Sequence, residues 1–105
     1  MEQIKVLLCC GNGMSSGFLA SSARKYIKKN KIAASVEAKS ITEVEEYIQS
    51  IDVLMLGPHY ASSLEKYQNI AKPYHVAVLV IPSNIYGELD GEELVKLAIK
   101  TVEKK

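Results

Sequence analysis

The chain has 105 residues, of which 48% are hydrophobic and 24% charged, and its formal net charge is +1 at pH 7. This length suits one domain over residues 1–105, and the ordinary composition argues against disorder. A net charge this small gives no field that would attract nucleic acid or an acidic membrane.

The two cysteines, Cys9 and Cys10, are neighbours in the sequence. Adjacent cysteines rarely bridge, because the disulfide would strain the backbone, so a reducing setting is favoured. The apolar run near the N-terminus is short and has a strand pattern, unlike a signal peptide, and no stretch is long enough to cross a bilayer. We therefore expect a cytoplasmic protein with no direct membrane insertion.

The first strand is predicted over residues 4–9, and a helix follows over about 15–29. Apolar residues at helical spacing should form the buried face of this helix. They are Phe18, Leu19, Ala23, Tyr26 and Ile27.

A second strand is predicted over residues 33–38. After it, Ser40 and Glu43 have the spacing of a capping box, so a helix should begin there. The inner side of this helix is expected to carry Ile41, Val44, Tyr47 and Ile48.

The nearly continuous apolar run over residues 52–56 predicts a third strand, buried on both faces, which the following Gly-Pro pair ends. A third helix should begin near Ser62 or Ser63 and end before Pro73. Its inner face is expected to hold Leu64, Tyr67 and either Ile70 or Ala71.

The fourth strand is predicted over residues 76–81, and a loop over 83–91. Asp90 and Glu93 have the pattern of a helix cap, and the last helix should fray at its C-terminal lysines, 104–105. Its inward residues are expected to be Leu94, Leu97, Ala98 and Val102.

Strand and helix patterns thus alternate through the whole chain. This alternation predicts a single three-layer α/β domain, with a four-stranded parallel sheet and helices on both faces. Ligands of such sheets bind beyond the carboxyl ends of the strands, where the strand order reverses. With the strand order 2-1-3-4, the loops after the first and third strands would be neighbours at that edge.

Cys10 ends the first strand and opens a loop of small residues that leads into the first helix. A thiol there could attack phosphorus, act in redox chemistry or fill space. Backbone N–H groups of such a loop lack internal partners, so they can bind a phosphate and favour the reactive thiolate. Cys9 faces the other way along the strand, so it is predicted to be a core residue. The predicted phosphate-binding loop consists of Gly11, Asn12, Gly13, Met14, Ser15, Ser16 and Gly17.

Several other motifs do not fit this loop. It lacks the lysine of a P-loop and the spacing of a G-x-G-x-x-G fingerprint, and the chain has no C-x-x-C pair. Two histidines and two adjacent cysteines give no metal-ligand spacing, so we expect no metal and no cofactor.

Low-molecular-weight tyrosine phosphatases resemble this layout and place an arginine six positions after the cysteine. That position is Ser16 here. Without the bidentate charge of an arginine, the loop could hold a phosphocysteine but should hydrolyse it poorly. A phosphatase-like or arsenate-reductase-like hydrolase stays the alternative, and a module that senses an anion without covalent chemistry is a third.

Three segments carry a family resemblance: residues 10–16, residues 54–59 (Leu-Met-Leu-Gly-Pro-His), and residues 86–91 with their Tyr-Gly and Asp-Gly pairs. In this order they resemble the IIB components of the bacterial phosphoenolpyruvate-dependent sugar phosphotransferase system, lactose/cellobiose family. The first segment matches that family's Cys-x-x-Gly-Met-Ser active-site loop. The sequence departs from the family at Gly17, where a small polar residue is expected, and Gly11 is shared with galactitol- and ascorbate-type IIB components.

The resemblance implies a phosphotransferase subunit that carries a phosphoryl group. A IIA protein would donate phosphate from a histidine to Cys10, and Cys10 would pass it to a disaccharide of cellobiose, chitobiose or lactose type held by membrane IIC. We expect a monomer that reaches the inner face of the membrane only through IIC and has no nucleic-acid partner. His59 and Tyr60 are candidate neighbours of the phosphate, although His59 also fits a surface histidine; His75 should lie at the opposite end of the sheet.

Overall fold

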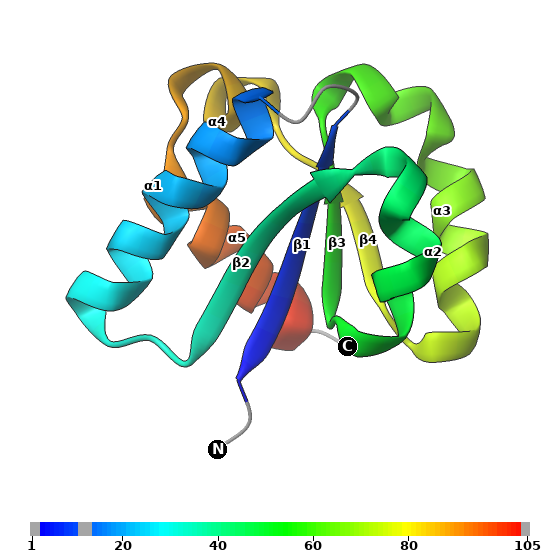
Figure 1. Ribbon diagram of the computed structural model, residues 1–105, viewed down its shortest axis with the longest axis horizontal. Helices are drawn as coiled ribbons and strands as arrows, with labels where there is room; N and C mark the ends of the chain where they lie inside the picture. The colour runs from blue at the N-terminus through cyan, green and yellow to red at the C-terminus, as the bar shows by residue number, and fades with distance from the viewer. Residues whose placement is uncertain (1–2, 11–13, 104–105) are drawn as a thin grey trace.

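The computed structural model describes residues 3–10 and 14–103, and its centre is one sheet of four parallel strands (Figure 1). The sheet order is β2-β1-β3-β4, which confirms the order predicted from the sequence. All three strand pairings are parallel. The strands are β1 (Ile4–Cys10), β2 (Ala34–Ser40), β3 (Val53–Leu56) and β4 (Ala77–Val80).

Helices cover both faces of the sheet, as predicted. Helices α1 (Met14–Asn30) and α5 (Gly91–Glu103) lie on one face, and α2 (Val44–Tyr47) and α3 (Leu64–Ala71) lie on the other (Figure 1). A short helix, α4 (Ser83–Glu88), lies beside the start of α1 at the end of the sheet toward which the strands point (Figure 1). Because all four strands are parallel, their carboxyl ends lie at one edge of the sheet.

Two apolar cores hold these layers together, one on each face of the sheet. The α1/α5 core includes Val6, Leu8, Leu19 and Leu94, and the α2/α3 core includes Leu7, Cys9, Val44, Leu54 and Leu56. Strand β3 is buried along its whole length, because both of its faces meet helices. Cys9 is fully buried in the α2/α3 core, which confirms its prediction as a core residue.

The capping box after β2 is present. The side chain of Ser40 accepts from the backbone N–H of Thr42, and Glu43 accepts from the backbone N–H of Ser40 over 3.1 Å. The helix predicted there is divided into a 3-10 turn η1 (Ile41–Glu43), α2, and a second 3-10 turn η2 (Ile48–Ser50). The third helix is likewise flanked by 3-10 turns, η3 (Pro58–Ser63) before it and η4 (Lys72–Tyr74) after it.

Two predictions about helices are wrong. Phe18 is 63% exposed instead of buried, because the buried stripe of α1 runs through Leu19, Ala20 and Ala23. Residues 83–91 are not a loop throughout: α4 forms there, and burial of its Ile85 in the α1/α5 core stabilises it. The buried face of α5 includes Val95 in addition to Leu94 and Ala98, which were expected there. The predicted fraying at residues 104–105 lies outside the described residues.

Gly91 joins α5 to α1 at close range. A Cβ at this position would overlap the backbone of Ser22 and Ala23, and the Gly91 N–H donates to Ser22 Oγ over 3.1 Å. The preceding Asp90 caps α5, because its Oδ1 accepts from the Glu93 N–H over 3.2 Å. The Asp-Gly pair of the third sequence segment therefore has a structural function: it sets where α5 starts and how closely α5 approaches α1.

Candidate functional site at the carboxyl edge of the sheet

The chain turns from strand to helix beside the middle of the sheet. β1 ends at Cys10, which pairs in register with Ser40 of β2, and α1 begins at Met14. Residues 11–13 and the side chains of Cys10, Met14, Ser15 and Ser16 lie outside the described part of the structure, so their contacts stay predictions. Met14 to Gly17 belong to the first turn of α1, and a Cβ at Gly17 would meet no atom within 4 Å.

The start of α1 has the electrostatic character of an anion site. Its first turn contains no acidic residue, while Lys28 and Lys29 lie in its last turn. The first N–H groups of a helix have no partner within the helix, and the helix dipole places positive charge there. The positive end of this 17-residue helix therefore follows Cys10 in the chain after three residues.

The turn after β3 is attached directly to β1. The N–H of Gly57 donates to the carbonyl of Cys9 over 2.9 Å, and the N–H of Tyr60 donates to the carbonyl of Gly57 over 2.9 Å. The first hydrogen bond lies one residue before Cys10. It places the turn after β3 beside the end of β1, and the predicted closeness of that turn to the loop after β1 stays a prediction.

His59 lies between two tyrosines from different elements. Its ring centroid is 4.7 Å from that of Tyr60 with the planes tilted by 45°, and 6.0 Å from that of Tyr86, edge-on at 71°. Tyr60 packs against the α2/α3 core, and Tyr86, in α4, packs against the α1/α5 core. The structure therefore brings together residues from the second and third sequence segments, and Tyr86 is a neighbour that the sequence analysis did not assign to the site.

His75 lies at the other end of the sheet, as predicted. It precedes β4 with φ of 58° at the end of η4 and is exposed. Within the described ranges, no three His, Cys, Asp or Glu side chains gather in a way that could hold a metal ion. In the same part of the chain, no helix has both the length and the apolar character needed to cross a membrane.

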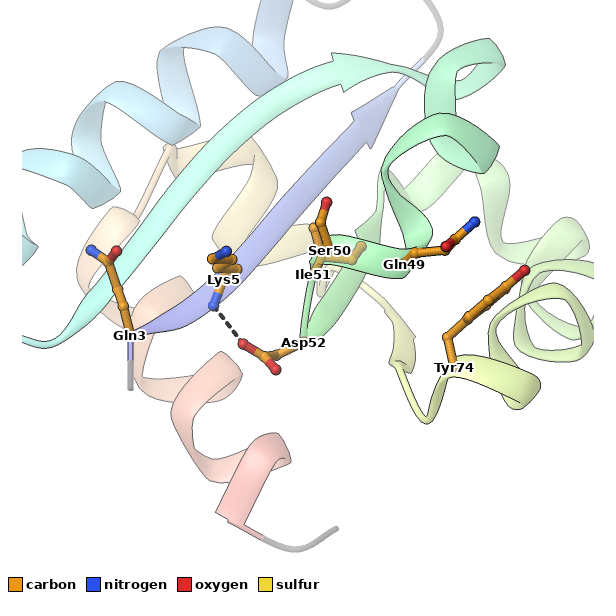
Figure 2. Close-up of a pocket in the computed structure, with 7 residues that line it drawn as sticks. All are labelled: Gln3, Lys5, Gln49, Ser50, Ile51, Asp52 and Tyr74. Carbon is orange, nitrogen blue, oxygen red and sulfur yellow. Dashed lines mark hydrogen bonds between the residues drawn. The ribbon is translucent and has the colours of Figure 1, made fainter. Parts of the chain in front are cut away.

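A cavity of about 530 Å³ lies at the amino edge of the sheet, where β1 and β3 begin (Figure 2). Figure 2 shows its side chains spread along a basin, with Gln3 at one end and Tyr74 at the other. Its polar groups already serve the fold: Asp52 Oδ2 accepts from the Lys5 N–H over 2.8 Å, and Ser50 Oγ donates to the Tyr47 carbonyl over 3.0 Å. These hydrogen bonds give the polar groups of the cavity a structural function, and the candidate site stays at the carboxyl edge, as predicted for such sheets.

This chain resembles known proteins of one family over most of its length. The model of the family described as the lactose/cellobiose-specific IIB subunit of the phosphotransferase system matches residues 5–97. An oligo-beta-mannoside-specific EIIB component of Bacillus subtilis is 27% identical over 95 residues, which are 90% of this chain and 92% of that protein. The solution structure of a cellobiose-specific IIB component from Borrelia burgdorferi superposes with a TM-score of 0.81 at 32% identity, covering 98% of this chain and 94% of that one.

One relative joins a similar segment to a larger protein. The lactose-specific EIICB component of Lacticaseibacillus casei is 25% identical over 88 residues, which are 84% of this chain and 15% of that protein. Its name combines a IIC and a IIB component.

Proposed function

The chain belongs to the lactose/cellobiose-specific IIB subunits of the sugar phosphotransferase system, and on this premise we propose that it carries a phosphoryl group on Cys10. The donor is a phosphohistidine of a IIA protein, and the acceptor is a sugar held by a membrane IIC component. The relative that unites IIC and IIB in one chain supports the second partner. The carrier is a monomer and a single domain that reaches the inner face of the membrane only through IIC.

Both transfers are in-line displacements at phosphorus. In the first, the Cys10 thiolate attacks, the P–N bond of the phosphohistidine breaks as the S–P bond forms, and the imidazole leaves as the neutral base after taking up a proton. In the second, a sugar hydroxyl attacks, the S–P bond breaks, and Cys10 leaves as the thiolate while the hydroxyl proton passes to a base on the partner. The protein needs no metal or cofactor for either step.

The observation that carries this proposal is the junction of β1 with α1. The N-terminal end of α1, which lacks an acidic residue in its first turn, follows Cys10 after three residues. We assign Gly11, Asn12 and Gly13, with the first turn of α1 from Met14 to Gly17, to binding the phosphoryl oxygens through backbone N–H groups. Those groups stabilise the thiolate before transfer and the phosphocysteine after it.

A second observation favours a carrier over a hydrolase. Arg24 is the one arginine of the sequence, and its Nε donates to the carbonyl of Val36 in β2 over 2.8 Å. It lies ten residues beyond the start of α1, which is about 15 Å along the helix axis. A cysteine phosphatase of the low-molecular-weight type uses a guanidinium at the phosphoryl group, and this one hydrogen-bonds β2 instead. The phosphocysteine should therefore persist until a sugar accepts its phosphate.

The immediate neighbours of the phosphoryl group in this proposal are His59 and Tyr60. The Gly57–Cys9 hydrogen bond holds their turn at the end of β1. An imidazole there can donate a hydrogen bond to a phosphoryl oxygen and offset part of its charge. Relatives named for oligo-beta-mannoside, cellobiose and lactose support a disaccharide or short oligosaccharide as the final acceptor.

Phosphorylation of single-cysteine variants tests the proposal. With phosphoenolpyruvate, the general relay proteins and a IIA protein, the unchanged chain should gain one phosphoryl group by intact-protein mass spectrometry. Cys10→Ser should gain none, while Cys9→Ser, at the buried neighbour, should still be phosphorylated. If the Cys10 variant gains the same group, the assignment of Cys10 is wrong; rapid turnover of a simple aryl phosphate by the unchanged chain would favour the hydrolase.

A further inference from the structure

We propose that Tyr86 is a positioning residue for phosphoryl transfer: its ring holds the imidazole of His59 in a fixed orientation beside the end of β1. This inference rests on the proposed function, since it takes His59 as a neighbour of the phosphoryl group. It adds a residue from α4, an element that the proposed chemistry does not otherwise use.

The position of α4 depends on three separate attachments. At its start, the Ile81 N–H donates to the Leu56 carbonyl over 2.8 Å, which ties the chain to the end of β3. Ile85 is buried in the α1/α5 core. Just beyond its end, Gly91 contacts the backbone of α1 at Ser22. Tyr86 therefore lies on a helix that is fixed to the rest of the protein at three points.

The three aromatic rings of His59, Tyr60 and Tyr86 connect the two faces of the sheet at its carboxyl edge. Tyr60 packs against the α2/α3 core and Tyr86 packs against the α1/α5 core. His59 contacts both rings. Tyr60 is the next residue after His59, so its contact moves with η3. Tyr86 comes from another element, so its contact fixes His59 relative to the rest of the edge.

An exposed histidine without such a contact would change rotamer freely. Catalysis by hydrogen-bond donors depends on donors that already point to where charge develops, and small displacements are costly. An edge-on aromatic pair at 6.0 Å lies within the range where such pairs attract each other. The Tyr86 ring should thus raise the fraction of molecules in which His59 faces the phosphoryl group.

The test measures the rate of phosphoryl acceptance at increasing concentrations of phosphorylated IIA. Tyr86→Leu should lower the maximal rate of acceptance by about three- to tenfold, the range expected for losing one aromatic pair. The concentration of phosphorylated IIA that gives half of that rate should be unchanged. Tyr86→Phe, which keeps the ring, should recover most of the lost rate. Tyr74→Leu is the matched control, because Tyr74 is an exposed tyrosine at the opposite edge of the sheet, and it should leave the rate unchanged.

A double-mutant cycle with His59→Ala separates positioning from a structural role. His59→Ala should be slow by itself, and adding Tyr86→Leu should slow it no further, because Tyr86 acts through His59. The inference is overturned if the two effects multiply, if His59→Ala is as fast as the unchanged chain, or if Tyr86→Phe is as slow as Tyr86→Leu. Phosphorylation of the unchanged chain at Cys10 is measured first, so a failure of the proposed function itself would appear there.

Discussion

The two edges of the sheet differ in what their polar groups do. At the amino edge, Asp52, Gln3 and Ser50 hydrogen-bond backbone atoms of neighbouring segments, and a wide polar cavity remains between them. At the carboxyl edge, a helix start without an acidic residue follows the end of β1 after three residues, and His59 lies between two tyrosines. The proposed function assigns phosphate binding to the carboxyl edge, so in that proposal the cavity at the amino edge is structural.

The largest expected effect comes from the junction that supports α4 at the carboxyl edge. Gly91→Ala should lower the free energy of unfolding by about 3 kcal/mol, because the new methyl group overlaps the backbone of α1. Urea denaturation measures this change. Gly87→Ala is the control, since a Cβ there meets no atom within 4 Å, and its stability should stay within about 0.5 kcal/mol. Equal stabilities of the two variants would contradict the close packing of α5 on α1.

The next largest effect is expected at the amino edge, where Asp52 has a structural hydrogen bond. Asp52→Ala removes the acceptor for the Lys5 N–H and should cost about 1–2 kcal/mol of unfolding free energy. Asp52→Asn keeps an acceptor oxygen and should cost less. Phosphoryl acceptance by the folded protein should be unchanged in both. A selective loss of transfer in Asp52→Ala at a temperature where it is fully folded would show that the two edges are coupled.

A smaller effect is expected where a structural group lies close to the site. Ser40 pairs in register with Cys10, and its side chain caps η1. Ser40→Ala should lower the free energy of unfolding by about 1 kcal/mol through loss of the cap. Thermal denaturation would record the shift, and the rate of phosphorylation should be that of the unchanged chain. A large drop in that rate would extend the site to the end of β2.

The smallest effect should come from Lys5, whose side chain lines the cavity at the amino edge. Lys5→Gln removes a charge from an exposed position and should change stability by less than about 0.5 kcal/mol. Transfer to and from Cys10 should proceed at the same rate. Slower phosphorylation of this variant would mean that the cavity takes part in partner or phosphate binding, and the contrast between the edges would fail.

Sequence patterns predicted the fold well where burial on one or two faces decides it. The apolar run of β3 predicted a fully buried strand, and Ser40 with Glu43 predicted a capping box. Phe18 shows the limit of this reasoning. It is adjacent to Leu19, and neighbouring residues of a helix point about 100° apart, so only one of them could face the core centre. Packing of α5 against Leu19 and Ala23 selected that face.

The candidate site was predictable in part for a related reason. Cys10 and its loop are contiguous in the sequence, so their pattern of small residues was visible there. The contact between His59 and Tyr86 joins residues 27 positions apart, and it depends on α4, which the sequence analysis expected to be a loop. A six-residue helix that contains a glycine has little helical tendency of its own. Burial of Ile85 stabilises it, and burial depends on tertiary packing.

The sequence by itself determined the alternation of strands and helices, the place of Cys10 at the end of the first strand, and the absence of an arginine from its loop. These features are local, because side-chain periodicity and turn chemistry act over a few residues. Tertiary structure alone decided that the turn after β3 hydrogen-bonds to Cys9, that Arg24 is engaged with β2, and that α4 brings Tyr86 to His59. Each of these is a contact between distant segments, which the order of the strands and the packing of the two layers bring together.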